Sequence, residues 1–519
     1  MRPFAIPRAF FILVLAAGTM AGARAELRPL PLEEIEGRVA LSASLPPEAD
    51  GLVLEGFQGT EAISSLFSFQ LDLLSSKGGT VSMDALLGKA MGVTISTAGG
   101  RMRHFHGICS RIVQGESDGA IVYRAEIVPS FWLLTRRQSS RIFQNETVPE
   151  ILQKILDAVP GLKYESRLQG TFHPHHYVVQ YRETDFDFAS RLMEEAGIFY
   201  YFVHDADGHT MVLGNTPEGH PDLPGVYPYL SQRLPPGRPD TIWTWEKSQE
   251  IRAGRVTLRD HTFELPSHDL EFGDSIQESV AAGQVTHRLA AGGGDALEIY
   301  DYPGRYAQRF DGVDPGGGDR PSELDKIFED GPRTARIRMQ EEAADALRIQ
   351  GRSTAAGFVA GHRFQLSRHF DGDGAYILTS VQHRARAGVY ENTFTCIPAG
   401  LPFRPRRSTT RPVVPGTQTA VVVGPPGQEI FTDKYGRVKV QFHWDREGNH
   451  DAGSSCWIRV AVPHAGTEPG SYLVPRVGDE VVVAFLEGDP DRPIIVGSVY
   501  NAERLVPSSM PMQQFEGWE

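Results

Sequence analysis

The segment GRVKVQFHWD, residues 436–445, decides the fold class of this chain. Its apolar side chains alternate with polar ones, which is the two-residue period of a β-strand with one buried face. We therefore expect a strand over 436–445 that packs against a core on one side only. The face expected in the core consists of Val438, Val440, Phe442 and Trp444, and the face expected in solvent of Lys439, Gln441, His443 and Asp445.

Three more short apolar runs follow it, WIRVAV (457–462), DEVVVAFLEG (479–488) and IIVGSVY (494–500). Four or five short strands within residues 416–501 predict a small closed barrel such as an OB fold. The loop EGDPDRP (487–493) carries three carboxylates but lacks the alternating ligands of an EF-hand. We interpret it as a tight turn built from Gly, Asp and Pro.

A proline- and arginine-rich stretch, residues 401–415, precedes this unit and predicts a linker. Upstream of it, residues 50–400 contain many short Val, Ile, Phe and Tyr runs separated by glycine turns, which is typical of a turn-rich β region. LFSFQLDLL (66–74) shows the alternation of a half-buried strand. The basic side chains of the linker are expected to be solvated, and they are Arg404, Arg406, Arg407 and Arg411.

Helical signals interrupt the strands at three places. Thr147 and Glu150 form a capping box for the first helix. Thr184 and Gly197 are placed to cap the two ends of the second. The third is expected from about 334 to 349. The sequence thus predicts a mainly β protein with inserted helices.

Composition limits the function classes. A length of 519 residues suggests two to four domains, and 40% hydrophobic residues allow a large core. The net charge of −14 disfavours nucleic acid as a partner, because acidic surfaces repel phosphate. Cys109, Cys396 and Cys456 are far apart and odd in number, so we expect buried thiols and no disulfide framework.

The N-terminus has the parts of a secretory signal peptide. Arg2 and Arg8 precede the apolar run 9–18, and an Ala-x-Ala site follows at 23–25. This pattern favours a cleaved signal over residues 1–25, with an uncleaved extension or a misplaced start codon as alternatives. Residues 26–49 are expected to form a leader or linker, and residues 502–519 a tail.

The sequence offers little chemistry. No nucleophile-elbow, Walker A, zincin or dinucleotide-binding motif occurs in it. The histidines of FHPHHY (172–177) and the pair His104 and His106 lack the spacing of a tetrahedral metal site. We therefore expect no catalytic residue, no cofactor and no metal.

Two regions of the chain carry a family resemblance. GRVKVQFHWDREG (436–448), SSCWIRVA (454–461) and residues 475–501 resemble the OB-fold module of the VgrG family. VVQYRETDFDFASRLMEEAGIFYYF (178–202) resembles the upstream part of the same family, and the likeness extends over about 50–501. The positions that carry the OB-fold motif are Gly436, Phe442, Trp444, Trp457, Pro475, Gly478, Gly488, Asp489 and Pro490.

The resemblance implies a fold and a mechanical function. Residues 50–400 would form two barrel-like domains of a phage baseplate hub, followed by the OB barrel. Three copies would form a spike that caps a hexameric Hcp-type tube and travels with it to puncture a target membrane. The chain would assemble in the cytoplasm and leave through the injection apparatus, which conflicts with a signal peptide.

Two departures from the family pattern stand beside this resemblance. His464 replaces a tryptophan, and the chain ends at Glu519, where family members continue into a β-helix. A separate β-helix, a PAAR-type tip or an effector is therefore an expected partner. The alternative interpretation is an exported binding protein or effector carrier derived from a spike.

Overall fold

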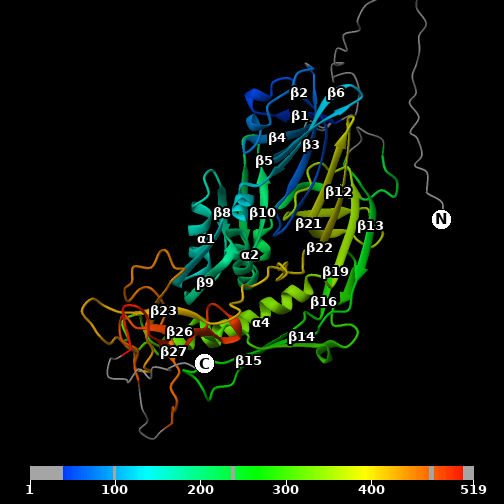
Figure 1. Ribbon diagram of the computed structural model, residues 1–519. Helices are drawn as coiled ribbons and strands as arrows, with labels where there is room; N and C mark the ends of the chain where they lie inside the picture. The colour runs from blue at the N-terminus through cyan, green and yellow to red at the C-terminus, as the bar shows by residue number, and fades with distance from the viewer. Residues whose placement is uncertain (1–38, 77, 97–100, 235–239, 467–472, 507–519) are drawn as a thin grey trace, which may run out of the picture. The chain divides into compact units, whose positions relative to one another are not determined.

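The computed structural model describes residues 39–76, 78–96, 101–234, 240–466 and 473–506. The predicted signal peptide and the chain beyond residue 506 lie outside these ranges. Within them the protein is mainly β with few helices, as the sequence predicts (Figure 1). No helix in the described ranges has the length and apolar character needed to cross a membrane.

The largest sheet has twelve strands, and its path begins with β1, in a segment that the sequence assigns to a leader. β21 pairs with β2, so this strand joins the two ends of the region within one sheet. In order, the path is β1 (Ala40–Ser44), β4 (Ala90–Ser96), β5 (Met102–Ser117), β6 (Ala120–Val128), β3 (Ser68–Ser75), β2 (Leu52–Ala62), β21 (Gly374–Arg386), β22 (Val389–Pro398), β19 (Leu347–Ser353) and β13 (Ile242–Gln249), and β20 (Arg363–Ser367) joins β21 to β12 (Asp222–Pro228).

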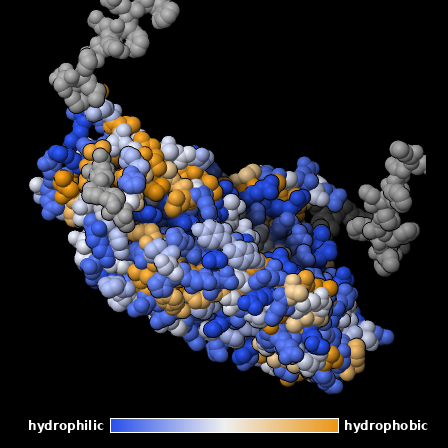
Figure 2. Space-filling model, turned by 90° about the horizontal axis from the view of Figure 1, so that it is seen from below, coloured by the Kyte–Doolittle hydropathy of each residue, from blue (hydrophilic) through white to orange (hydrophobic). Residues whose placement is uncertain are grey.

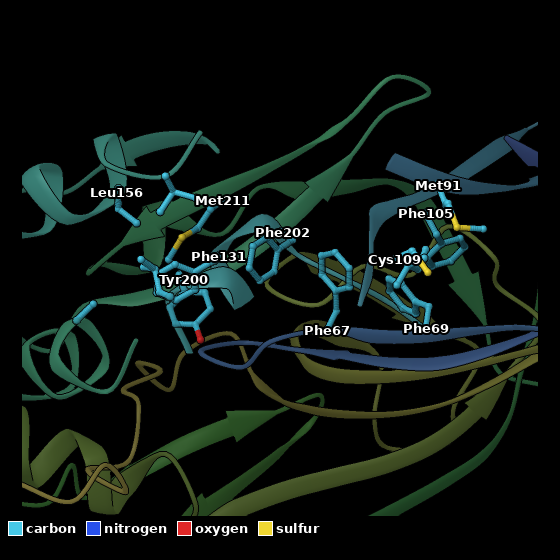
Figure 3. Packing of buried hydrophobic residues seen from close by; sticks show 14 of the residues in the cluster. Phe67, Phe69, Met91, Phe105, Cys109, Phe131, Leu156, Tyr200, Phe202 and Met211 are labelled. Carbon is cyan, nitrogen blue, oxygen red and sulfur yellow. The ribbon is translucent and has the colours of Figure 1, made fainter. Parts of the chain in front are cut away.

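The alternation predicted for residues 66–74 is confirmed. Phe67, Phe69 and Leu71 are fully buried, whereas Ser68 between them is exposed. Figure 3 shows the rings of Phe67 and Phe69 among side chains from other strands, and the ring of Phe105 lies 5.1 Å from that of Phe69. The three cysteines are buried free thiols.

In the described residues before the linker, four smaller sheets accompany the large one. β9 (His175–Thr184) pairs with β7 (Gln138–Glu146) and is the strand that matters most for the site described below. The others are β10 (Phe199–His204) with β11 (His209–Gly214) and β8 (Lys163–Arg167); β14 (Arg255–Asp260) with β15 (Leu270–Ser275) and β18 (Glu298–Asp301); and β16 (Ser279–Ala282) with β17 (Val285–Arg288).

Two of the predicted helices form where their caps place them. α1 (Val148–Asp157) has the reciprocal capping box of Thr147 and Glu150. α2 (Asp185–Ala196) begins after Thr184, which accepts a hydrogen bond from the Asp187 amide. It ends at Gly197, whose φ of 70° is the left-handed conformation that favours glycine.

The third helix differs from the prediction. After the short α3 (Ser322–Asp325), α4 runs over Ile327–Ala343, so it begins and ends earlier than expected. Residues 347–349 belong to β19, which pairs with β13 and β22 on its two sides. Hydrogen bonding to a strand on each side of β19 overrides the helical propensity of residues 347–349. The residue pattern along the chain does not reveal this tertiary pairing.

The C-terminal sheet has five strands in the order β24, β23, β26, β27, β25. It is curled, and Val438 and Ile458 exchange two backbone hydrogen bonds of 3.0 and 2.8 Å between segments at its two ends. The strand bounds are β23 (Gln418–Val423), β24 (Lys439–Phe442), β25 (Arg459–Val460), β26 (Glu480–Phe485) and β27 (Pro493–Val499).

The prediction of one solvent-facing side for residues 436–445 is wrong. Lys439 and Gln441 are buried, and β24 ends at Phe442. The segment that follows β24 satisfies both polar groups: the Lys439 ammonium donates to the Ala452 carbonyl, and the Gln441 amide donates to Asp445. A strand covered on both faces can therefore contain polar residues, provided that each one is hydrogen-bonded.

Candidate functional site: the junction of two cores

β9 is shared between two hydrophobic cores. Its side chains alternate, and Val178 packs in the core of the large sheet together with α1 and α2. Tyr177, Val179 and Tyr181 point the other way and belong to the core of the C-terminal sheet, with Val440. A strand from the upstream region thus completes the core of the downstream one, and separating the two would expose apolar surface on both sides.

Aromatic and polar contacts extend this shared core. The ring of Trp444 lies 5.9 Å from that of Tyr181, and Gln418 bridges them. The indole N–H of Trp457 donates to the carbonyl of Asp314 at 2.8 Å. Two tryptophans of the predicted OB motif are therefore held by groups of the upstream region.

A buried ion pair lies beside Trp457. The Arg437 guanidinium donates two hydrogen bonds to the Asp311 carboxylate, at 2.7 and 2.9 Å, and a third to Asp433 at 2.6 Å. Burial opposes the charged form of Arg437, but the hydrogen bonds and charge of Asp311 outweigh it, so its pKa is raised. The fork of an arginine fits this bidentate geometry, and a lysine would not.

A second cluster of charges forms around Arg411. Its guanidinium pairs with Glu195 of α2 at 2.7 Å and with Asp491 in the turn before β27. Asp491 also accepts a hydrogen bond of 2.7 Å from the Val179 amide of β9. Burial opposes the ionised form of Glu195, yet Arg411 holds its pKa down at about 2. The turn EGDPDRP is therefore a docking element, a role that its sequence does not reveal.

The linker is also bound along its length. Arg404 donates to the Gly197 carbonyl at 2.9 Å and to Gln340 at 2.8 Å. Thr409 donates to Glu194 at 2.8 Å. The expectation of solvated arginines is wrong for Arg404 and Arg411, which are half-buried. It holds for Arg406 and Arg407, which are exposed, although they pair with Asp345 and Glu341. The groups that bind Arg404 come from the C-terminal cap of α2, from α4 and from Asn215, and those that bind Arg411 come from α2 and from the turn before β27. The composition of the linker does not reveal these partners.

The predicted positions of the OB-fold motif have three structural roles. Phe442, Trp457, Pro475 and Pro490 are buried, and Trp444 is half-buried. Gly436, Gly478 and Gly488 have φ of 68°, 91° and 72°, which explains glycine at these turns. Asp489 is buried within 3.6 Å of both Arg305 and Arg411.

The histidines that the sequence places near one another each contact a different residue. His173 pairs with Glu329 at 2.9 Å and His176 with Asp311 at 3.2 Å. Burial, with the charge of Arg309, lowers the pKa of His175 to about 3. His104 contacts Thr94, whereas His106 contacts His209. Among the described residues no three His, Cys, Asp or Glu side chains form a group that could hold a metal ion.

Two family models match the chain. Residues 60–389 match the phage tail baseplate hub (GPD) model, and residues 428–500 match the type VI secretion system/phage-baseplate injector OB domain model. The two matched ranges lie on either side of the linker, and the junction described above joins them.

Curated relatives match over most of this chain. The type VI secretion system spike proteins VgrG1c, VgrG1b and VgrG1a of Pseudomonas aeruginosa are 38%, 38% and 39% identical over 98%, 90% and 90% of it. The matches cover 68%, 61% and 70% of those relatives, so this chain spans about two thirds of their length. The actin cross-linking toxin VgrG1 of Vibrio cholerae is 31% identical over 89% of this chain and 42% of its own length.

Solved structures show the same fold. An E. coli component of the type VI secretion system, which exhibits structural similarity to the T4 bacteriophage tail proteins gp27 and gp5, matches with a TM-score of 0.61 at 22% identity, over 88% of this chain and all of the other. A chain of the lidded Francisella PdpA–VgrG complex matches with a TM-score of 0.52 at 8% identity, over 86% of this chain and 67% of that one.

Proposed function

The chain belongs to the VgrG family of type VI secretion system spike proteins, and from this premise we propose that it forms the tip of a contractile injection machine. Three copies associate into a spike, cap a hexameric Hcp-type tube and travel outward with it when the machine contracts. The chain bears load and performs no catalysis, and it needs no cofactor, metal or nucleic acid.

One observation carries this proposal, which is the core shared through β9. A tip that is pushed through a membrane must transmit force from the tube to its point without bending. Tyr177, Val179 and Tyr181 place side chains of the upstream region in the downstream core, and Arg411 and Arg437 add ion pairs on either side. This construction supports a single rigid body in place of two domains on a flexible linker.

The finer architecture follows from the same premise. Residues 50–400 form the hub-like region, which we propose contains two barrel-like domains, residues 401–415 connect it, and residues 416–501 form an OB barrel. Two similar barrels per chain in a trimer give six, which matches a sixfold tube. A β-helix, a PAAR-type tip or an effector is a further partner that we propose for this trimer.

The test is assembly of the purified full chain. We expect a trimer in multi-angle light scattering, and co-purification with the hexameric tube protein of the same secretion system. A chain that stays monomeric across the accessible concentration range and does not bind the tube would overturn the proposal.

A second candidate function is an exported binding protein or effector carrier derived from a spike. The N-terminal pattern of Arg2, Arg8, the apolar run 9–18 and the Ala-x-Ala site favours it. N-terminal sequencing of the protein from its native host separates the two. A mature start near Glu26 with export in the absence of the injection apparatus supports this candidate, and export that requires the apparatus supports the spike.

A further inference from the structure

The polar face of the twelve-stranded sheet carries a groove of about 560 Å³. Cross-strand register sets its floor, because Gln58 of β2 lies opposite Gln70 of β3 on one side and Arg384 of β21 on the other. On the next strand, Arg384 lies opposite Glu391. This volume is in the range of small-molecule sites. The side chains that line the groove include Gln58, Gln70, Trp243, Arg352, Gln382 and Arg384.

An irregularity in β13 turns a tryptophan into this groove. The pairing of β13 with β19 shifts register between Ile242 and Thr244, so Trp243 is an extra residue on that strand. Ile242 and Trp245 can then both pack in the core while Trp243 lines the polar groove. Bulges commonly re-aim a side chain at a binding site. Arg233 packs over the Trp243 ring at 5.4 Å and pairs with Glu391 at 3.2 Å, which positions the ring.

The groove contains two cationic side chains at one end, whereas the carboxylates of Glu126 and Asp72 at the other end accept hydrogen bonds from the lining residues Ser68 and Gln70. Arg352 and Arg384 line it, and within the described part of the chain neither has an ion-pair partner. Glu391 is the one carboxylate in the lining, and Arg233 neutralises it. The whole chain has a net charge of −14, so two unpaired guanidinium groups in one groove favour an anionic occupant.

We propose that this groove binds a carboxylated saccharide. Trp243 supplies a flat apolar surface for the C–H face of a sugar ring. The amides of Gln58 and Gln382 can donate to and accept from hydroxyl groups, and the amide oxygen of Gln70, whose N–H already donates to Asp72, can accept from them. Arg352 and Arg384, two strands apart and offset by two residues along them, lie roughly 12 Å from each other, and each can bind a carboxylate through its planar fork.

The lining favours a saccharide over an acidic peptide. Peptides are recognised through strand addition at a sheet edge or through pockets for apolar anchors. The groove lies on strand faces, and most of its lining is polar, with Trp243 as its one large apolar ring. A hydroxyl-rich ligand satisfies such a surface over its whole length, whereas a peptide would leave amide groups unpaired.

The experiment is calorimetric titration of the full chain at low ionic strength with tetragalacturonate. Maltotetraose is the neutral saccharide control, and tetraglutamate is the acidic-peptide control. We expect saturable binding of tetragalacturonate, at least about tenfold tighter than binding of maltotetraose. Trp243→Ala and Arg384→Gln should each weaken it by about tenfold. Arg386→Gln, at an exposed position on β21 outside the groove, should change it by less than about twofold.

Three results would overturn the proposal. They are absence of saturable tetragalacturonate binding to folded protein, equal affinity for tetraglutamate, and a change of oligomeric state in Arg384→Gln, which would make the groove a contact between copies. Light scattering and thermal unfolding of each variant accompany the titrations. Arg384 is exposed, so its variant keeps the test decisive if Trp243→Ala does not fold. The proposal is independent of trimer formation and tube binding.

Discussion

The Arg437 guanidinium and the Asp311 carboxylate form a bidentate ion pair of 2.7 and 2.9 Å across 126 residues of sequence. Both side chains are almost fully buried, at 3% and 5% exposure. This pair fastens the C-terminal sheet to the upstream region at the point where Trp457 also crosses. Loss of the Asp311 carboxylate would leave the buried Arg437 guanidinium with Asp433 as its one remaining carboxylate partner.

We therefore expect Asp311→Ala to destabilise the protein by about 3 kcal/mol, because the remaining buried guanidinium loses its main partner. Denaturant unfolding measures the change. The matched control is Arg476→Ala, which removes a pair with Glu429 whose side chains are 56% and 69% exposed. That control should cost less than about 1 kcal/mol. Equal losses in the two variants would show that the junction does not depend on Asp311.

Acid should weaken the core of the large sheet through Glu61. Burial disfavours its charge, but Arg103 and His383 lower its pKa to about 2, against 4.5 unfolded. A lowered folded pKa means that the stabilisation is present above about pH 4.5 and is lost as the pH falls toward 2. The shift corresponds to about 3 kcal/mol. We expect Glu61→Gln to be less stable at neutral pH, and its deficit to shrink below pH 4.5. A deficit that is constant with pH would contradict this assignment.

Glu341 of α4 should act in the opposite direction. Burial raises its pKa to about 7, and Glu342 and Glu194 add to the effect. A raised folded pKa means that stability falls as the pH rises from 4.5 to 7. Glu341→Gln keeps an acceptor for the Arg407 amide and removes the buried charge. We expect it to raise stability at pH 8 by about 1–3 kcal/mol and to have little effect at pH 5.

Thermal unfolding of the unsubstituted chain and of Glu341→Gln, each at about pH 5 and pH 8, measures the difference in stability. Glu55→Gln, at an exposed position on β2, is the control for the same substitution outside a buried site. A Glu341→Gln variant that is less stable at pH 8 would mean that the ionised carboxylate is needed to hold the linker.

Gly197 should tolerate alanine poorly for two separable reasons. Its φ is +70°, and an added Cβ would lie 3.2 Å from the Ile337 side chain of α4. Gly161, with φ of +77° and no atom within 4 Å of an added Cβ, isolates the backbone cost alone. We expect Gly161→Ala to cost about 1 kcal/mol and Gly197→Ala about 1–3 kcal/mol more. Equal costs, measured by denaturant unfolding, would show that Ile337 moves aside without penalty.

The sequence determined what depends on near neighbours along the chain. The caps of α1 and α2 could be predicted because a capping box and a glycine stop act within four residues. The buried face of 66–74 could be predicted because alternation is a property of the strand itself. The family resemblance rests on motifs that are also contiguous, such as 436–448 and 178–202.

Tertiary structure alone decided which parts of the chain share a core. Nothing local in β9 indicates that Tyr177, Val179 and Tyr181 pack with strands more than 200 residues away, because alternation specifies two faces and not their partners. The bounds of α4 and β19, the burial of Lys439 and the pairing of Arg411 and Arg437 depend in the same way on groups that folding brings together. Burial and charge pairing are interactions in space, so the sequence supplies the groups, and the fold selects which of them meet.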